Sequence, residues 1–233
     1  MAQRPVFMPV STEAVLVRTE MVEFRWHAGM AISQKQRSIA SLHEAATSLL
    51  DLRRVLEISS KSPDRLGVLL SAFNLPIKIG SRQRETPLEC AFQASKVFTD
   101  GGPYEDILQM DARDAKRDPR LKSSGNLTGF RFEGADWPLE PQTAFYDWIY
   151  MRALRCQPDL TSQVKVFDAF TDIEFNPAKS INCQAYSAAL FLSLSKRNQM
   201  DQALSSWSAF LEILRGYPTN NVRQNDQIQG RLF

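Results

Sequence analysis

Histidine and cysteine are scarce in this chain, and their scarcity excludes several kinds of site. The 233 residues include two histidines, His27 and His43, so a histidine-dependent catalytic triad is disfavoured. His43 falls in a predicted helix, where a structural role is favoured. The three cysteines, Cys90, Cys156 and Cys183, form no close pair, and each has apolar neighbours. This spacing argues against a disulfide framework or a zinc site and predicts three small core side chains.

Long apolar runs and a leader pattern are also missing. No stretch approaches 18 consecutive apolar residues, and the first residues, MAQRPVFMPVST, lack the basic-then-apolar order of a signal peptide. We therefore expect a soluble, cytoplasmic protein with no membrane partner. Hydrophobic residues make up 43% of the chain, which is enough for a packed core and excludes global disorder.

Neither sign of charge is in large excess, because the formal net charge is +2. This balance does not by itself argue for a nucleic-acid partner. Basic side chains are nevertheless clustered in two segments, IKIGSRQR (residues 77–84) and ARDAKRDPRLK (residues 112–122). These two segments are the candidate contacts for an anionic ligand.

Standard signatures of nucleotide-binding and hydrolytic sites are absent. The chain has no phosphate-binding P-loop, no dinucleotide-binding G-x-G-x-x-G, no H-E-x-x-H and no nucleophile elbow. Chemistry, if there is any, therefore rests on carboxylates and lysine.

Hydrophobic periodicity predicts an α+β fold, mainly α-helical with a small sheet, as a single domain over residues 1–233. Residues 1–30 are β-prone, since Val22, Phe24 and Trp26 alternate with charged residues. Further helices are predicted over residues 35–57, after Pro63, from Pro87 to about Gly101, and over 141–155, 181–196 and 200–215. The remaining segments are predicted as extended (70–80), loop-rich with short helices (103–140), a polar loop (167–180) and a mobile tail (217–233).

Residues 86–100, TPLECAFQASKVFTD, combine an apolar helical pattern with three polar side chains. Glu89, Gln93 and Lys96 recur at i, i+4 and i+7, which puts them on one face of a helix. The opposite, core-facing arc would carry Cys90, Ala91, Ala94, Val97 and Phe98. The polar face is either a solvated surface with weak mutual charge support or the wall of a catalytic cleft.

Asp172 and Glu174 form a second carboxylate cluster, in the segment FTDIEFNP. Loops of this kind often carry functional residues, although a turn or capping role for Asp172 fits equally well. Aromatic residues near these segments either belong to the core or stack on a purine: Phe73, Phe92, Tyr146 and Trp148.

Several of these segments together resemble the NADAR family, the YbiA-like proteins. LSAFNL followed by TPLECAFQASKVF resembles the family's aromatic-Ser-Asn-Phe and S-E-x-x-F-Q-A-x-K-F pattern. ARDAKRDPRL resembles the short helix after that motif, and FTDIEFNPAKSINCQAYSAALFL resembles the C-terminal motif and its helix. Ile173, Glu174 and Phe175 stand where the family has tryptophan and glycine. The resemblance covers about residues 55–196.

Other segments are similar to one branch, the NADAR antitoxins paired with DarT-class DNA ADP-ribosyltransferase toxins. These segments are EFRWHAGMAISQKQRSI, ISSKSPDRLG, AFQASKVFTDGGPY and WPLEPQTAFYDWIY. The resemblance implies a NADAR domain that removes ADP-ribose from guanine bases in DNA by N-glycoside hydrolysis. It also implies free ADP-ribose as product, a cognate toxin as functional partner, and no metal or cofactor.

For the residues, the resemblance implies that Glu89, Lys96 and Asp172 are catalytic. Cleavage at the ribose anomeric carbon builds oxocarbenium character, which a carboxylate stabilises while another group moves protons. Lys96 would protonate or orient the substrate or, with a depressed pKa, attack as an amine. The expected substrate-binding residues are Ser60, Lys61, Phe73, Asn74, Arg82, Arg84, Phe92, Gln93 and Asn182.

Two other functions stay open at this level. One is a non-catalytic module that binds ADP-ribose or a related nucleotide. The other is an antitoxin that neutralises its toxin only by direct contact. The presence of both Glu89 and Lys96 favours the enzyme, because a binding module has no need of the pair.

Overall fold

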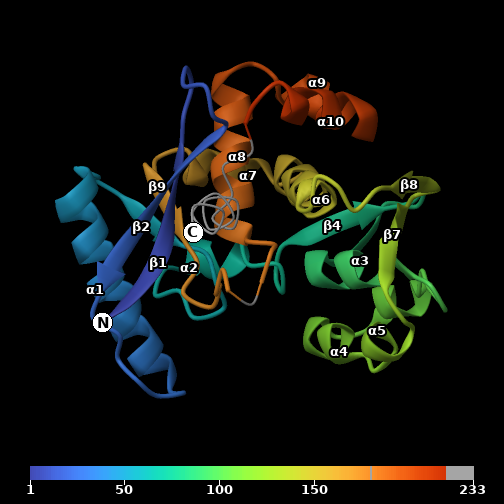
Figure 1. Cartoon of the computed structure of the whole chain (residues 1–233), viewed down its shortest axis with the longest axis horizontal. Coiled ribbons are helices and arrows are strands. Elements are labelled where there is room, and N and C mark those ends of the chain that lie inside the picture. The colour runs from blue at the N-terminus through green and yellow to red at the C-terminus, as the bar shows by residue number, and fades with distance from the viewer. Residues whose placement is uncertain (179, 219–233) are drawn as a thin grey trace, which may run out of the picture.

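The fold is α+β, as the sequence predicts, in a computed structural model that describes residues 1–178 and 180–218 (Figure 1). Two groups of strands lie on opposite sides of the view in Figure 1. Helices α6 (Ala144–Arg155) and α8 (Gln184–Lys196) lie between the two groups. The candidate site residues come from both groups and from these two helices.

A four-stranded sheet forms the first group, in the order β2–β1–β9–β3. Strands β1 (Ala2–Pro9) and β2 (Val17–Phe24) make an antiparallel hairpin. Strand β9 (Ala169–Thr171) pairs antiparallel with β1 and parallel with β3 (Val55–Glu57). This parallel pairing brings together two segments more than a hundred residues apart in the chain.

Two smaller antiparallel sheets form the second group. Strands β4 (Pro76–Ile79) and β5 (Arg84–Pro87) make a hairpin. Strands β6 (Lys96–Phe98), β7 (Leu127–Phe132) and β8 (Ala135–Trp137) make a sheet with β7 in the middle. Because β6 pairs with the central strand, its first residue is held by the register of the sheet.

Helix α1 (Ile32–Leu50) covers the first sheet, and the other helices are short. Its buried residues are Ser38, Ile39, Leu42 and Ala46, spaced at intervals that put them on one helical face. The remaining helices are α2 (Arg65–Leu69), α3 (Leu88–Ala94), the 3-10 helix η1 (Glu105–Gln109), α4 (Ala112–Arg117), α5 (Arg120–Ser123), α7 (Pro158–Val164), α9 (Met200–Ser205) and α10 (Trp207–Arg215). Across the described residues, no helix has the length and apolarity that crossing a membrane requires.

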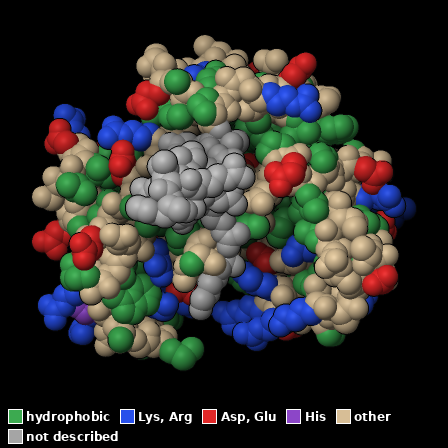
Figure 2. Space-filling model, viewed as in Figure 1, with side chains coloured by type: hydrophobic (Ala, Val, Ile, Leu, Met, Phe, Trp, Pro, Cys, Tyr) green, Lys and Arg blue, Asp and Glu red, His purple; other side chains and the backbone are tan. Residues whose placement is uncertain are grey.

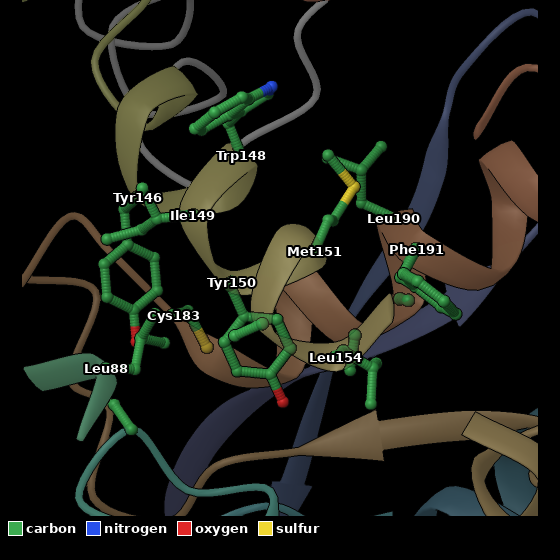
Figure 3. Packing of buried hydrophobic residues seen from close by; sticks show 14 of the residues in the cluster. Leu88, Tyr146, Trp148, Ile149, Tyr150, Met151, Leu154, Cys183, Leu190 and Phe191 are labelled. Carbon is green, nitrogen blue, oxygen red and sulfur yellow. The ribbon is translucent and has the colours of Figure 1, made fainter. Parts of the chain in front are cut away.

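Helix α6 is buried on most sides and organises the main core. Figure 3 shows Tyr146 and Tyr150 projecting from the same side of this helix. The Tyr150 hydroxyl donates to the Leu70 carbonyl at 3.0 Å, and the Trp148 indole N–H donates to the Ala203 carbonyl at 3.1 Å. Since buried polar groups need partners, these bonds fix how α6 sits against its neighbours.

The structure corrects several predicted element boundaries. The helix predicted over residues 35–57 ends at Leu50, because Asp51 adopts a left-handed conformation (φ 52°) and residues 55–57 form β3. The polar loop predicted at 167–180 contains β9, and the loop-rich segment 103–140 contains β7 and β8. Only Pro76–Ile79 of the extended segment 70–80 is a strand. The helix predicted over 200–215 is interrupted at Ser206, which is extended and caps α10.

Three smaller predictions have mixed outcomes. Cys90 and Cys183 are buried as predicted, whereas Cys156 is exposed at the C-terminal end of α6. His43 has the structural setting that was expected: burial lowers its pKa to about 4, and its ring contacts Thr171. The predicted mobile tail, 217–233, lies outside the described residues from residue 219 onward.

Asp147 gives the core a testable pH dependence. This buried side chain of α6 accepts a hydrogen bond from the Ser187 hydroxyl of α8 at 2.6 Å, and burial raises its pKa to about 7. A carboxyl group whose pKa is higher in the folded state makes the folded protein less stable as pH rises, here between about pH 4 and pH 7. Asn keeps the acceptor for Ser187 and cannot ionise. We therefore predict that Asp147→Asn raises the free energy of unfolding at pH 8 by up to about 4 kcal/mol relative to the original chain.

Urea unfolding at pH 5 and pH 8 measures this difference. The gain should be much smaller at pH 5 than at pH 8. Asp136→Asn is the matched control, because Asp136 is an exposed carboxylate paired with Arg131. A gain from Asp147→Asn that is equal at both pH values would contradict the assignment.

Candidate active site

Helix α3 carries three of the predicted site residues, Glu89, Phe92 and Gln93, and is buried along its whole length. Glu89 and Gln93 lie one turn apart, and each is 5% exposed. The Gln93 amide Nε2 donates to Glu89 Oε1 at 2.8 Å, and the Glu89 backbone N–H donates to the Ala72 carbonyl at 2.9 Å. The face that these two residues share is therefore not a solvated surface.

Lys96 reaches the same region from a different element than the sequence predicts. The predicted helix ends at Ala94, and Lys96 is the first residue of β6, paired with Phe130. Its ammonium group lies 4.9 Å from the centre of the Phe92 ring. Burial lowers the pKa of Lys96; Glu89 opposes this shift and Lys116 adds to it. The β-branched Val97 and aromatic Phe98 favour a strand here, which the helical periodicity concealed.

Helix α4 adds a cation opposite Glu89. Asp111 caps this helix by accepting from the Arg113 backbone N–H at 2.8 Å. One turn further, Lys116 Nζ lies 3.9 Å from Glu89 Oε1 and 5.2 Å from the centre of the Phe73 ring. The Lys116 side chain is 57% exposed and that of Glu89 is 7% exposed. The pair thus joins a buried carboxylate to a solvent-accessible ammonium.

Asp172 follows β9 and is buried at the base of the site. Its Oδ1 accepts from the backbone N–H groups of Glu174 and Phe175, at 3.0 and 3.2 Å. Burial, together with the nearby carboxyl of Glu57, raises its pKa to about 8. The turn role that the sequence left open for Asp172 is therefore real, and it leaves the carboxyl at a cavity wall.

Three adjoining cavities lie between these elements. We call them the central cavity (about 410 Å³), the Lys96 cavity (about 490 Å³) and the Asn74 cavity (about 480 Å³). The central and Lys96 cavities share Glu89, Lys116, Tyr146, Ser180 and Asn182. The central and Asn74 cavities share Ser60, Lys61, Phe73, Arg113 and Arg117. The three cavities therefore form a row, with the central cavity between the other two.

Most predicted site residues line this row. Glu89 and Asp172 both line the central cavity, and Lys96, Phe92 and Gln93 line the Lys96 cavity. The predicted binding residues Ser60, Lys61, Phe73, Asn74 and Asn182 each line at least one cavity. The Oε1 of Gln93 and the Oδ1 of Asn182 are buried and have no hydrogen-bond partner among the described residues. A ligand that draws these side chains into the cavity could supply the missing donors.

Arg82 and Arg84 are not brought together with the other predicted residues. Both are exposed, at the β4–β5 turn and the start of β5, and neither lines any of the three cavities. The second basic segment is at the site instead: Arg113 and Arg117 of α4 line the central and Asn74 cavities. Figure 2 shows Lys and Arg side chains gathered where α4 lies in Figure 1.

One residue near the site, Glu57, was missed as a functional candidate from the sequence, and Tyr146 was considered only as a core residue or as a ring that stacks on a purine. Tyr146 of α6 lines both the central and Lys96 cavities, and burial together with the charge of Glu89 raises its pKa well above 10. Its polar aromatic character was the only available signal. Glu57 was assigned to a helix, and nothing in its local sequence pointed to Asp172. Within residues 1–178 and 180–218, no cluster of three or more His, Cys, Asp or Glu side chains could hold a metal ion.

Comparison with known proteins identifies a family. The family model described as DarT1-associated NADAR antitoxin matches residues 2–224, which is nearly the whole chain. The match includes every residue of the three cavities. A search of curated proteins finds no match.

The environment of Lys96 predicts two opposite pKa changes. Removing the Glu89 charge by Glu89→Gln should lower the pKa of Lys96 further, because Glu89 stabilises the ammonium form. Removing the Lys116 charge by Lys116→Met should raise it, because like charges repel. The NMR shift of ¹³C-labelled lysine Cε, followed against pH, measures both. Changes of the same sign in the two variants would contradict this description.

Proposed function

The chain belongs to the family of DarT1-associated NADAR antitoxins, and on this premise we propose that it is an ADP-ribosyl-guanosine N-glycohydrolase. The family gives it the role of an antitoxin and associates it with a DarT toxin. In the proposal it removes ADP-ribose from guanine bases of DNA and releases free ADP-ribose. Because the proposed substrate is DNA, the proposal also includes a cytoplasmic location.

The observation that carries the proposal is the position of Glu89. This buried carboxylate lies on the wall shared by the central and Lys96 cavities, so it faces both. An N-glycoside has two unlike halves, a ribose and a base, joined at the bond that breaks. A carboxylate at the boundary of two cavities is suited to stabilise the positive charge that develops on the anomeric carbon between them.

Asp172 and Glu89 divide the proton transfers in this proposal. Asp172, with a pKa of about 8, is mainly protonated at neutral pH and can donate to the guanine nitrogen as its bond to carbon breaks. Glu89 stabilises the oxocarbenium character and accepts a proton from the attacking water. The sum is ADP-ribosyl-guanine plus water giving guanine plus ADP-ribose, and both carboxyl groups return to their starting states after one proton exchange with solvent.

Lys96 has two possible roles in this scheme. Burial favours its neutral amine, which is the form that can attack the anomeric carbon. Its ammonium form would instead donate a proton or orient the base above the Phe92 ring. Both roles need Lys96 close to the bond that breaks, and Lys96 lines the same cavity as Glu89.

The remaining cavities have the chemistry that the rest of the substrate requires. Arg113, Arg117 and Lys61 line both the central and the Asn74 cavities. One guanidinium group can donate two parallel hydrogen bonds to two phosphate oxygens, so these arginines are suited to bind a pyrophosphate. Phe73 lines both cavities and offers a ring to the adenosine end of ADP-ribose. The guanine would then occupy the Lys96 cavity, above Phe92 and Phe130, with its glycosidic nitrogen at the opening to the central cavity, which Asp172 lines.

Two rival functions account for the same family membership. A binding module for ADP-ribose would use the cavities and the arginines but would gain nothing from a buried carboxylate at the boundary between two cavities. An antitoxin that acts only by contact with its toxin would need neither. The next experiment separates all three.

We predict that Glu89→Gln lowers the glycohydrolase rate by about two orders of magnitude or more, while binding of the substrate persists. Gln keeps the size of the side chain and removes the charge, which is needed only as the bond breaks. The measurements are the release of ADP-ribose from an ADP-ribosylated guanine oligonucleotide, the affinity for that oligonucleotide, and rescue of cells from the toxin. Glu105→Gln is the matched control, because Glu105 is an exposed glutamate outside the cavities.

Each outcome of this experiment favours one function. Loss of both turnover and rescue, in a variant that still binds, supports catalysis. Binding without turnover in the original chain would support the binding module. Full rescue by an inactive variant would support action by contact alone, and full activity would remove Glu89 from the mechanism.

The position of α4 predicts which cations contact the substrate. Arg113→Ala and Arg117→Ala should each weaken binding of the modified oligonucleotide and flatten its salt dependence. Each lost contact to a backbone phosphate of the DNA reduces the slope of log K against log salt by about 0.7 for single strands or about 0.9 for duplex. Arg82→Ala and Arg84→Ala are matched controls, because both side chains lie away from the cavities. A larger effect from the controls would restore the first basic segment as the binding site.

A further inference from the structure

Glu57 holds the peptide segment on both sides of Asp172. It ends strand β3, is 1% exposed, and pairs in register with Thr171 of the parallel strand β9. The Thr171 hydroxyl donates to Glu57 Oε2 at 2.7 Å, and the Ile173 backbone N–H donates to Glu57 Oε1 at 2.8 Å. One carboxyl group therefore binds the residue before Asp172 and the residue after it.

The two carboxyl groups are buried close to each other, with few opposite charges around them. Burial raises the pKa of both groups, and the charge of Glu57 adds to the rise at Asp172. The other titratable groups that face the pair come from several elements: Arg4 of β1, His43 of α1 through Thr171, Glu174 after β9, Tyr146 and Tyr150 of α6, and Cys183 before α8. Like charges this close favour one shared proton over two negative charges.

Hydrogen bonds decide which member of the pair keeps that proton. Both oxygens of Glu57 accept a hydrogen bond, which stabilises its negative form. Asp172 accepts two bonds at Oδ1. No hydrogen bond from the described part of the chain reaches its Oδ2. Asp172, which has this oxygen available to carry the proton, lines the central cavity, whereas Glu57 lines none of the three cavities.

We propose that Glu57 is a positioning residue for Asp172: it clamps residues 171–173 and, by carrying the negative charge of the pair, keeps the proton on the Asp172 carboxyl that faces the central cavity. The use of that proton in the reaction rests on the proposed function. There, the Asp172 O–H bond breaks as a new N–H bond forms on the departing guanine, and the electron pair of the glycosidic bond stays with the base. The placement of the proton itself does not depend on the substrate.

Charge distinguishes this role from a purely structural one. Gln at position 57 could still accept from Thr171 or Ile173, but it carries no negative charge. A structural clamp would therefore be largely preserved in Glu57→Gln, while the effect on Asp172 would be lost. Glu174→Gln is the matched control, since Glu174 also faces Asp172 but is exposed and paired with Lys35 at 3.0 Å.

The test is a carboxyl ¹³C NMR titration of the full chain, with the Asp172 signal assigned by its loss in Asp172→Asn. In the original chain Asp172 should titrate near pH 8. Glu57→Gln should move that midpoint down by about one pH unit or more, and Glu174→Gln should move it much less. A midpoint near 4 in the original chain, or an unchanged midpoint in Glu57→Gln, would overturn the proposal.

A second variant covers the case in which Glu57→Gln does not fold. Thr171→Val keeps the strand and the Glu57 charge but removes one donor to Glu57 Oε2, so the proton should shift toward Glu57 and the Asp172 midpoint should fall. An unchanged midpoint in Thr171→Val would then overturn the proposal.

A pH profile of kcat on the modified oligonucleotide tests the catalytic consequence. Its alkaline limb should move to lower pH in Glu57→Gln, in parallel with the NMR midpoint. An NMR shift without a change in the profile would reject the role of Glu57 in catalysis. If the original chain has no glycohydrolase activity, the proposed function fails, and the NMR titration still decides where the proton lies.

Discussion

Burial of ionisable side chains is the constraint on which the rest of the site depends. A buried carboxyl must accept hydrogen bonds, pair with a cation or keep its proton. The chain uses all three solutions within one region. Glu89 has Gln93 and the Lys116 ammonium group 3.9 Å away, Glu57 has Thr171 and Ile173, and Asp172 has two backbone donors and a raised pKa. Each solution requires a particular neighbour, so the elements around the cavities have little freedom to move apart.

The same requirement explains why so short a strand as β9 matters. Its three residues are buried between β1 and β3, and they join Asp172 to the first sheet. On the other side of the cavities, β6 is joined to the second group of strands. The site is therefore a junction between two sheets, held by α6 and α8. Catalytic groups on separate rigid elements keep their distances better than groups on a single mobile loop.

The sequence alone predicts much of this arrangement, for reasons that particular residues make clear. Hydrophobic patterning predicts a helix at each of α1, α6, α8 and α10, although α1 ends earlier than predicted and α10 was predicted as one helix with α9. The motif around Glu89 and Gln93 predicts two polar residues on one face of an apolar helix, and the structure shows them as a buried, hydrogen-bonded pair. Strands β3 and β9 have three residues each, too few for a pattern of alternation, so the Glu57–Asp172 pair was invisible. Arg82 and Arg113 are equally basic in sequence, and only the tertiary fold separates the exposed turn from the cavity wall.

The end of α3 at Ala94 changes what Lys96 can do. On a continuous helix, Lys96 would follow Glu89 by two turns and move with it. On β6 its backbone is held by pairing with Phe130, while Glu89 is held by the hydrogen bond from its backbone to Ala72. The ammonium group and the carboxylate therefore approach the Lys96 cavity from independent supports. Both residues line this cavity, and within the described residues they form no direct ion pair with each other. The exposed ammonium group of Lys116 offsets part of the negative charge of Glu89.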